Sequence, residues 1–173
     1  PNKQFINPIN SAGGLRGIKR QLYEGGLRAA MTVRWPGKVK AGSTSKFIWD
    51  MRDMFPTACE IAGIKPPEHL DGISVLPTLL GRKQKGRKAH YWEIHSPFQQ
   101  AVRMGDWKGI RFGTKGPLSL YHLKIDRSEQ TNVAAQHPEI VKTMETFLVS
   151  ARTDSKYFPA VEQPKKKRFK KDN

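Results

Sequence analysis

The chain has 173 residues, of which 37% are hydrophobic and 27% are charged, a size and balance that favour one globular domain with at most a small appended unit. No apolar run approaches the roughly 18 residues that a membrane-spanning helix needs, so we expect no membrane partner. The net charge of +16 is typical of proteins that bind nucleic acid or another polyanion.

Much of this charge lies at the C-terminal end. Residues 165–172 contain six cations and one anion and almost nothing apolar to bury, so we expect residues 159–173 to form a disordered basic tail. The rest of the chain lacks the interleaved aromatic and basic residues of a single-strand-binding surface. Nucleic acid is therefore not the expected partner, and a non-catalytic module that binds a polyanion or another protein is the alternative function.

The first predicted elements are a loop and a strand. Residues 1–18 are rich in Asn, Ser and Gly, which predicts a loop. Leu27 to Trp35 is an apolar run with β-branched members that ends at Pro36-Gly37. This pattern predicts a largely buried strand followed by a turn.

Two helices are predicted next. Apolar residues recur at three- and four-residue spacing between Phe47 and Ala62. Within this stripe we expect the Asp53 side chain to cap a helix start, Pro56 to lie in the first turn and Gly63 to form a left-handed C-terminal cap. The same pattern, with a proline in the first turn and a glycine at the C-terminal end, predicts a shorter helix in residues 74–81.

The periodicity changes after a basic loop at residues 82–88, which we interpret as a domain boundary between 1–88 and 89–158. Alternating residues predict four short strands: His90–His95, Gln100–Met104, Trp107–Phe112 and Leu118–Leu123. Their tight connections favour an antiparallel sheet.

One further helix is predicted after the sheet. Pro138 and Glu139 open a segment in which six apolar residues share a helical face: Ile140, Val141, Met144, Phe147, Leu148 and Ala151. A four-stranded sheet with one apolar side needs a cover, and we expect this helix to provide it.

Motifs that identify a catalytic site without knowledge of a family are absent, including Gly-x-Ser-x-Gly, His-Glu-x-x-His and Gly-x-Gly-x-x-Gly. The single cysteine, Cys59, excludes an internal disulfide, and its place in the helical stripe favours a buried, unreactive thiol over a nucleophile. The five histidines show no ligand spacing. No metal-binding residue is therefore predicted.

A series of short motifs opens with Lys19-Arg20-Gln21-Leu22-Tyr23-Glu24-Gly25-Gly26. The others follow in order: the Arg34 to Gly42 segment, Asp53-Met54-Phe55-Pro56-Thr57, Ala62-Gly63, Asp71-Gly72-Ile73-Ser74, Leu79-Leu80-Gly81, Asp106-Trp107-Lys108, Leu120-Tyr121-His122-Leu123, and then Asp126, Glu129 and Asn132. With these motifs the chain resembles the distal half of a formylglycine-dependent sulfatase, an arylsulfatase-like enzyme of the alkaline-phosphatase-like superfamily.

The resemblance implies an α+β fold with an α/β part. One strand and two helices complete a large mixed sheet of the parent enzyme, and a four-stranded antiparallel sheet covered by the C-terminal helix follows. It also implies hydrolysis of an aryl or sugar sulfate ester, with calcium and formylglycine as cofactors of the parent. A sulfated small molecule or glycan is the expected ligand.

The same resemblance implies that part of the machinery lies elsewhere. The family makes formylglycine from the Cys or Ser of a Cys/Ser-x-Pro/Ala-x-Arg motif, whereas Cys59 is followed by Glu60-Ile61-Ala62-Gly63. The acidic calcium ligands also belong upstream. We therefore expect a C-terminal fragment that is inactive alone and that needs the N-terminal sulfatase half as partner. We expect this fragment to contain no complete calcium site. Export is typical of the family, but the chain itself leaves the compartment open.

Lys19 carries the one catalytic role that the resemblance transfers to this chain. It matches the family's lysine that contacts a sulfate oxygen and the leaving-group oxygen, whereas the residues alone would favour an exposed lysine beside Arg20. An ammonium placed where charge develops stabilises the transition state more than the ground state.

The remaining motif residues are predicted to contact substrate or to shape the backbone. Trp92, His95 and Gln99, together with Gln100 and the basic loop, are the candidates for substrate contact. We assign Gly25 and Gly26 to positive-φ backbone conformations, and Asp71 and Asp106 to turns.

Overall fold

The computed structural model describes residues 11–160, and in it the chain divides into two compact units. Residues 11–29 and 88–160 form the first, called the sheet unit below, and residues 30–87 form the second, the helical unit. The N-terminal segment therefore belongs with the C-terminal sheet. The domain boundary that the sequence indicates at residue 88 stays a prediction for the parent protein.

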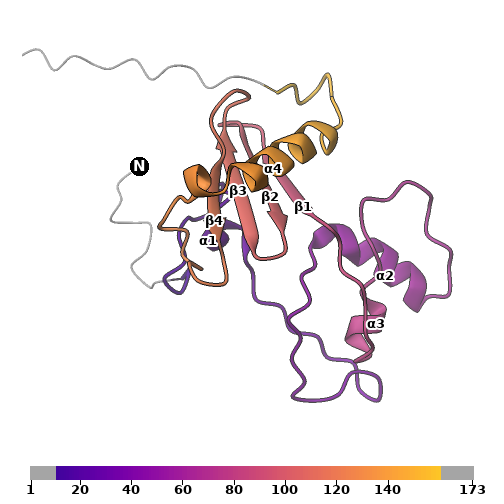
Figure 1. Ribbon diagram of the computed structural model, residues 1–173. Coiled ribbons are helices and arrows are strands. Elements are labelled where there is room, and N and C mark those ends of the chain that lie inside the picture. Colours follow the sequence, from indigo (N-terminus) through magenta and orange to yellow (C-terminus); the bar gives the residue numbers. More distant parts are fainter. Residues whose placement is uncertain (1–10, 161–173) are drawn as a thin grey trace, which may run out of the picture. The chain divides into compact units, whose positions relative to one another are not determined.

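Four antiparallel strands build the sheet unit in the order β1-β2-β3-β4: β1 His90–Ile94, β2 Gln99–Met104, β3 Trp107–Phe112 and β4 Ser119–His122 (Figure 1). Because every strand end lies within one residue of its predicted position, the predicted sheet is confirmed. Met104 pairs with Trp107, so Gly105 and Asp106 alone form the β2–β3 turn. Gly105 has a φ of 58°, which residues with a Cβ rarely adopt.

After the sheet come a short 3-10 helix, Ala134–Gln136, and helix α4, Pro138–Ser150. Helix α4 lies across one face of the sheet, as Figure 1 shows, and its fully buried Met144 packs in one cluster with Val102 and Leu120. A methyl group at Gly109 would lie 3.0 Å from Sδ of Met144, so the missing side chain lets the helix approach. The predicted covering helix is confirmed.

The opposite face of the sheet carries the N-terminal segment. Its short helix α1, Glu24–Leu27, directly follows Leu22 and Tyr23, which are 1% and 9% exposed. Both residues belong to a hydrophobic cluster with one or two residues from each of three strands or their ends: Ala101, Ile110, Tyr121 and Leu123. The sheet is thus covered on both faces, by segments that flank it in the sequence.

The helical unit contains a 3-10 helix, Met51–Asp53, helix α2, Met54–Ile61, and the short helix α3, Leu76–Leu79. Gly63 follows α2 with a φ of 67°, which is the left-handed cap that the sequence predicts. Among the residues that the structure describes, no helix has both the length and the apolar character needed to cross a membrane.

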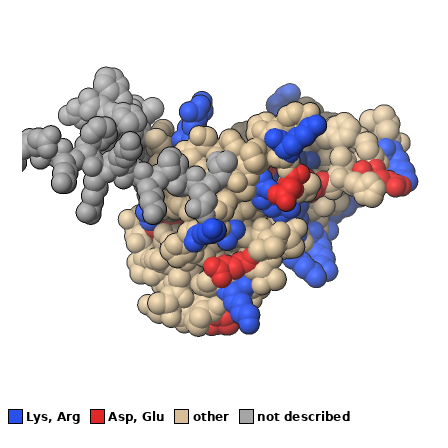
Figure 2. Space-filling model, turned by 90° about the horizontal axis from the view of Figure 1, so that it is seen from above, with Lys and Arg blue, Asp and Glu red and all other residues tan. Residues whose placement is uncertain are grey.

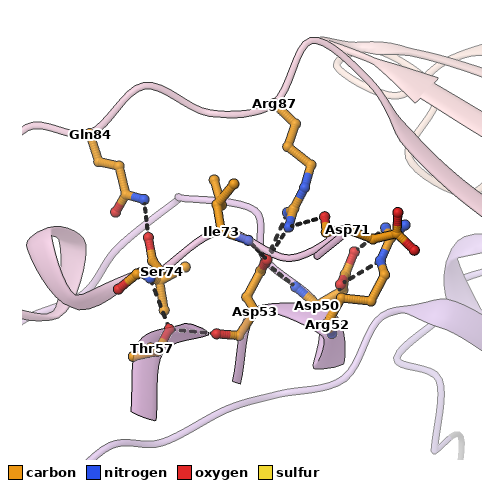
Figure 3. A network of polar contacts seen from close by, with 10 residues as sticks. Asp50, Arg52, Asp53, Thr57, Asp71, Ile73, Ser74, Gln84 and Arg87 are labelled. Atoms are coloured by element: carbon orange, nitrogen blue, oxygen red, sulfur yellow. Dashed lines mark hydrogen bonds and ion pairs between the residues drawn. The ribbon is translucent and has the colours of Figure 1, made fainter. Parts of the chain in front are cut away.

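Asp53 is the centre of a polar network in the helical unit (Figure 3). Its fully buried carboxylate accepts hydrogen bonds from the backbone N–H groups of Asp50 (3.0 Å) and Ile73 (2.9 Å) and pairs with Arg87. Burial would raise the pKa of Asp53, but these hydrogen bonds and the charge of Arg87 outweigh it and lower the pKa. The prediction that the Asp53 side chain caps α2 is wrong, because the carboxylate has a charged partner elsewhere.

The predicted strand between Leu27 and Trp35 is also wrong for this chain. Leu27 is the last residue of α1, and residues 28–35 have no regular secondary structure and are mostly exposed. A strand needs a neighbour for its backbone N–H and C=O groups. None of the four described strands pairs with this segment.

The apolar stripe of α2 differs from expectation in a related way. Phe55 and Ile61 are 55% and 47% exposed, whereas Pro56 and Thr57 are the buried residues of the helix. The helix is confirmed from Met54 onward, whereas residues 47–50 of the predicted stripe are not helical, and the described chain supplies no surface that covers this face of α2.

Candidate functional site

Lys19 lies in a tight turn formed by residues 18–21. The backbone N–H of Gln21 donates to the carbonyl of Ile18 (2.9 Å), and the backbone N–H of Ile18 donates to Oε1 of Gln21 (3.1 Å). Arg20 completes the turn with a φ of 70°, in the left-handed region. Lys19 is exposed, so a locally closed turn presents it to solvent.

The sheet holds this turn from its C-terminal side. The next residues, Leu22 and Tyr23, are buried in the hydrophobic cluster. At the start of β2, Gln99 donates a hydrogen bond from Nε2 to the carbonyl of Arg20 (3.2 Å). Gln99 is only 2% exposed, so its donor is shielded from bulk water, whereas Arg20 is exposed. The backbone that carries Lys19 is therefore attached to the sheet.

A buried group of charges lies at the start of α1. Nζ of Lys108, on β3, is 2.9 Å from Oε1 of Glu24 and 2.9 Å from Oε1 of Glu129. Oε2 of Glu129 accepts a hydrogen bond from the backbone N–H of Glu24 (2.6 Å). None of the three residues is more than 4% exposed. An ammonium between two carboxylates offsets part of the cost of burying each charge, so this group joins α1 to β3 and to the segment after β4.

Further charges and hydrogen bonds surround this buried group. Burial, together with the nearby Glu24 carboxylate, raises the pKa of Glu129 above its ordinary value, while Lys108 acts in the opposite direction. Arg28 and Arg103 lie 3.6 Å and 3.8 Å from Oε2 of Glu24 and add two further cations on that side. Arg16 donates to the backbone carbonyl of Glu129 (2.7 Å) and so connects the segment before the Lys19 turn to the same place.

The positions of Gly25 and Gly26 require glycine because neighbouring backbone atoms leave no space for a Cβ atom. A Cβ at Gly25 would lie 2.4 Å from the carbonyl oxygen of Gly17, and a Cβ at Gly26 would lie 2.0 Å from that of Gln21. Neither glycine has a positive φ among the described backbone angles, so the predicted reason for the pair is wrong. The two glycines let α1 pack directly on the backbone of the Lys19 turn.

The structure also locates the other predicted site residues. Trp92, on β1, is half-buried, stacks on His90 with ring centroids 5.7 Å apart and packs against the cluster that holds Leu22. His95 directly follows β1 and contacts the ring of Phe158 edge-on. Of the predicted substrate contacts, Gln99 is thus bonded to the Lys19 turn and Trp92 packs beneath the same segment.

The described residues do not fit a calcium cage or a formylglycine precursor. Within residues 11–160, no group of three or more His, Cys, Asp or Glu side chains could hold a metal ion. Cys59 lies inside α2 and the residues after it do not match the modification motif. No chemical step is therefore assigned to either group in this chain.

Basic side chains are spread over the described surface. On the face drawn in Figure 2, Lys and Arg form several separate groups with uncharged surface and acidic residues between them. In the basic loop, Arg87 is paired with the buried Asp53. Apart from residues 159 and 160, the predicted basic tail of residues 159–173 lies outside the described residues, and the polyanion-binding alternative stays a prediction.

Sequence reasoning missed the buried charge group. Along the chain, Lys108 is 84 residues and Glu129 is 105 residues from Glu24, so no local sequence pattern pairs these three residues. The signal that was present is that all three residues belong to motifs of the resemblance. Their side-chain chemistry alone would have suggested three solvent-exposed charges.

The sequence is similar to known sulfatases. Residues 17–154 match the family described as N-sulphoglucosamine sulphohydrolase, C-terminal, a range that includes the Lys19 turn, the buried charges and α4. An N-acetylgalactosamine-6-O-sulfatase of Bacteroides thetaiotaomicron is 32% identical over 164 residues, which cover 86% of this chain and 32% of that protein. Arylsulfatase K of Homo sapiens is 30% identical over 164 residues, covering 87% and 30%. The chain thus spans about a third of the length of these curated relatives.

Solved structures show the same similarity. A Bacteroides thetaiotaomicron structure from work on the metabolism of multiple glycosaminoglycans matches with a TM-score of 0.71 at 31% identity, covering 80% of this chain and 32% of that one. A structure in complex with its substrate, D-glucosamine-2-N,6-O-disulfate, matches with a TM-score of 0.60 at 27% identity, covering 68% and 26%. The similarity therefore extends from sequence to fold.

Proposed function

Because this chain belongs to the family of C-terminal N-sulphoglucosamine sulphohydrolase domains, within the alkaline-phosphatase-like sulfatases, we propose that it forms the distal part of an enzyme that hydrolyses sulfate esters. The nucleophile and the calcium site belong, in this proposal, to the N-terminal sulfatase half. The observation that carries the proposal is the exposed Lys19 on a turn that the buried sheet residues hold.

The proposed role of Lys19 follows from where charge moves in the reaction. When the bond between sulfur and the ester oxygen breaks, negative charge develops on the departing oxygen. An ammonium positioned beside that oxygen stabilises the transition state more than the bound ester. Attachment of the turn to the sheet supports this role, because a fixed donor does not have to be reorganised during the reaction.

We infer that the substrate is a sulfated sugar. The similar Bacteroides thetaiotaomicron relative is named for a 6-O-sulfated amino sugar, and a similar structure was solved with a sulfated glucosamine. His95 at the end of β1 is the proposed contact for a sugar beyond the sulfate group. Turnover of a sulfated amino sugar should therefore exceed turnover of an aryl sulfate in kcat/KM.

The catalytic proposal is tested in the complete enzyme, with this chain joined to its N-terminal sulfatase half. Lys19→Ala should lower kcat by about 10²–10³-fold, the usual cost of removing one donor to a developing oxyanion. Steady-state kinetics on a series of aryl sulfates measures this. Lys124→Ala removes an equal charge from an exposed position after β4 and should leave kcat unchanged.

Two outcomes contradict the proposal. Equal kinetics for the wild type and Lys19→Ala would remove Lys19 from the active site. Turnover of an aryl sulfate by the 173-residue chain alone, with calcium present, would show that the N-terminal half is not needed.

A further inference from the structure

Gln99 is buried where it cannot present its side chain to a substrate, and its hydrogen bond points to another role. We propose that Gln99 is a positioning residue that fixes the Lys19–Arg20 turn on the sheet and thereby orients the ammonium of Lys19. The inference rests on the proposed catalytic function of Lys19. It replaces the direct substrate contact that the sequence suggested for Gln99.

The geometry of the Gln99 side chain joins two loops. Its Nε2 donates to the carbonyl of Arg20 at 3.2 Å and lies 3.5 Å from the carbonyl of Pro97, in the β1–β2 connection. The amide group therefore bridges the Lys19 turn and the hairpin end of the sheet. The other hydrogen bonds of the turn, between Ile18 and Gln21, are local and close the turn without attaching it to anything.

Fold stability alone does not explain an amide at this position. Within the described residues, Oε1 of Gln99 is buried and has no hydrogen-bond partner. An unsatisfied buried acceptor costs stability, whereas an apolar side chain of similar volume would fill the same space without that cost. What glutamine adds here is the donor to the Arg20 carbonyl.

The position of that carbonyl matters because it lies one residue from Lys19. A displacement of about 1 Å in a group that acts on reacting atoms can cost roughly 100-fold in rate. Buried Leu22 fixes the chain after the turn, and α1 packs on the carbonyls of Ile18 and Gln21 at the two ends of the turn. The Gln99 bond acts on the turn itself, so its loss should let the Lys19 backbone move while the cluster below stays packed.

Gln100 provides a matched control within the same strand. It is also 2% exposed, so its side chain is not available for the substrate contact that the sequence suggested, and as the next residue of β2 it faces the opposite side of the sheet. There its Nε2 donates to Oη of Tyr91 (2.8 Å), and its Oε1 accepts from Nε of Arg111 (3.1 Å). Gln99→Met and Gln100→Met thus remove the same group from equally buried positions, and only the first touches the Lys19 turn.

The first experiment uses the ¹⁵N-labelled chain and does not depend on activity. Backbone order parameters of Lys19 and Arg20 should be near ~0.85 in the wild type and should fall below about 0.6 in Gln99→Met, with Gln100→Met unchanged. Amide signals of β2 and β3 serve as the control for folding. Gln99→Leu is the second variant should the methionine variant not fold. Unchanged order parameters in a folded Gln99 variant would overturn the inference.

The second experiment measures the consequence in the complete enzyme. Gln99→Met should lower kcat about 10-fold with little change in KM, and the loss should be larger for phenyl sulfate than for 4-nitrophenyl sulfate, because the poorer leaving group depends more on the cation. Lys19→Ala should show the same selective loss to a greater degree, and Gln100→Met should not show it.

The kinetics of the Lys19 and Gln99 variants distinguish a failure of the positioning role of Gln99 from a failure of the catalytic role of Lys19. If Lys19→Ala gives the leaving-group effect and Gln99→Met does not, the positioning role is wrong while the proposed function stands. If Lys19→Ala lacks the effect, the catalytic role of Lys19 fails and the positioning role fails with it, whatever the order parameters show.

Discussion

Lys19 and Lys108 have the same side chain and opposite surroundings. Lys19 is exposed on a turn, whereas Lys108 is fully buried between two carboxylates. In a chain with 31 basic residues, nothing local in the sequence separates the two. The difference arises because the partners of Lys108 come from α1 and from the segment after β4, which only the folded sheet brings together.

Removing the Lys108 ammonium should strongly destabilise the sheet unit. Lys108→Met leaves Glu24 and Glu129 facing each other in a buried place, and breaking a buried ion pair in this way costs about 3–5 kcal/mol. The check is the urea dependence of amide exchange in β3. Lys124→Met, at an exposed position, is the matched control and should change the free energy of unfolding by less than about 0.5 kcal/mol. An equal effect of both changes would show that the buried charges of Lys108, Glu24 and Glu129 add no more to the free energy of unfolding than an exposed lysine does.

The close packing around Gly26 predicts that a methyl group at this position destabilises the sheet unit. Gly26→Ala would bring a methyl group against the carbonyl of Gln21, which is backbone and cannot rotate away, so α1 must shift off the turn. We expect a loss of at least about 2 kcal/mol, as for overpacked positions, and new amide shifts at Lys19 and Arg20. Gly86→Ala meets only an ordinary contact at 3.7 Å and should be tolerated. Thermal unfolding of the two variants makes the comparison.

At the scale of elements, the sequence predicted the helices and strands that depend on local residues or on partners close in the chain. The four strands and α4 have strong periodicity, tight turns and partners nearby in the chain, and they appear within a residue or two of expectation. The segment from Leu27 to Trp35 has the composition of a strand, but none of the strands described between residues 11 and 160 pairs with it. Composition reports only that a segment could be buried in a sheet, so the prediction failed there.

The candidate site was predictable to a similar extent. The resemblance pointed to Lys19, and the structure places Gln99 in contact with its turn. The burial of Gln99 could not be predicted, because alternation along β2 assigns Gln99 and Gln100 to opposite faces without saying that both faces are covered. That both are covered follows from α4 on one side and the Lys19 motif on the other.

At the scale of the whole molecule, different interactions stabilise the interior of each of the two units. The sheet unit has hydrophobic clusters on both faces of its sheet. The helical unit depends more on the polar network around Asp53, and apolar residues of α2 remain exposed. The two units should therefore respond differently to acid.

The helical unit should lose stability below about pH 4. The pKa of Asp53 lies below its ordinary value of 3.8, so the folded state binds fewer protons there than the unfolded state, and the stability that Asp53 contributes above pH 3.8 is lost as the pH falls through its folded pKa. Burial would raise the pKa of Asp50 as well, but Arg52 lowers it to about 2, which extends the loss in the same direction.

Glu129 acts in the opposite sense in the sheet unit. Its folded pKa is raised above 4.5, so its contribution increases as the pH falls from neutral and is complete below 4.5. Urea midpoints followed by the indole N–H signals of Trp49 and Trp107 report the two units separately. Between pH 6 and pH 3 we expect the Trp49 midpoint to fall more than the Trp107 midpoint, and Asp53→Asn to reduce the difference. Parallel shifts of the two midpoints, with Asp53→Asn behaving as the wild type, would show that the Asp53 network does not determine the acid stability of the helical unit.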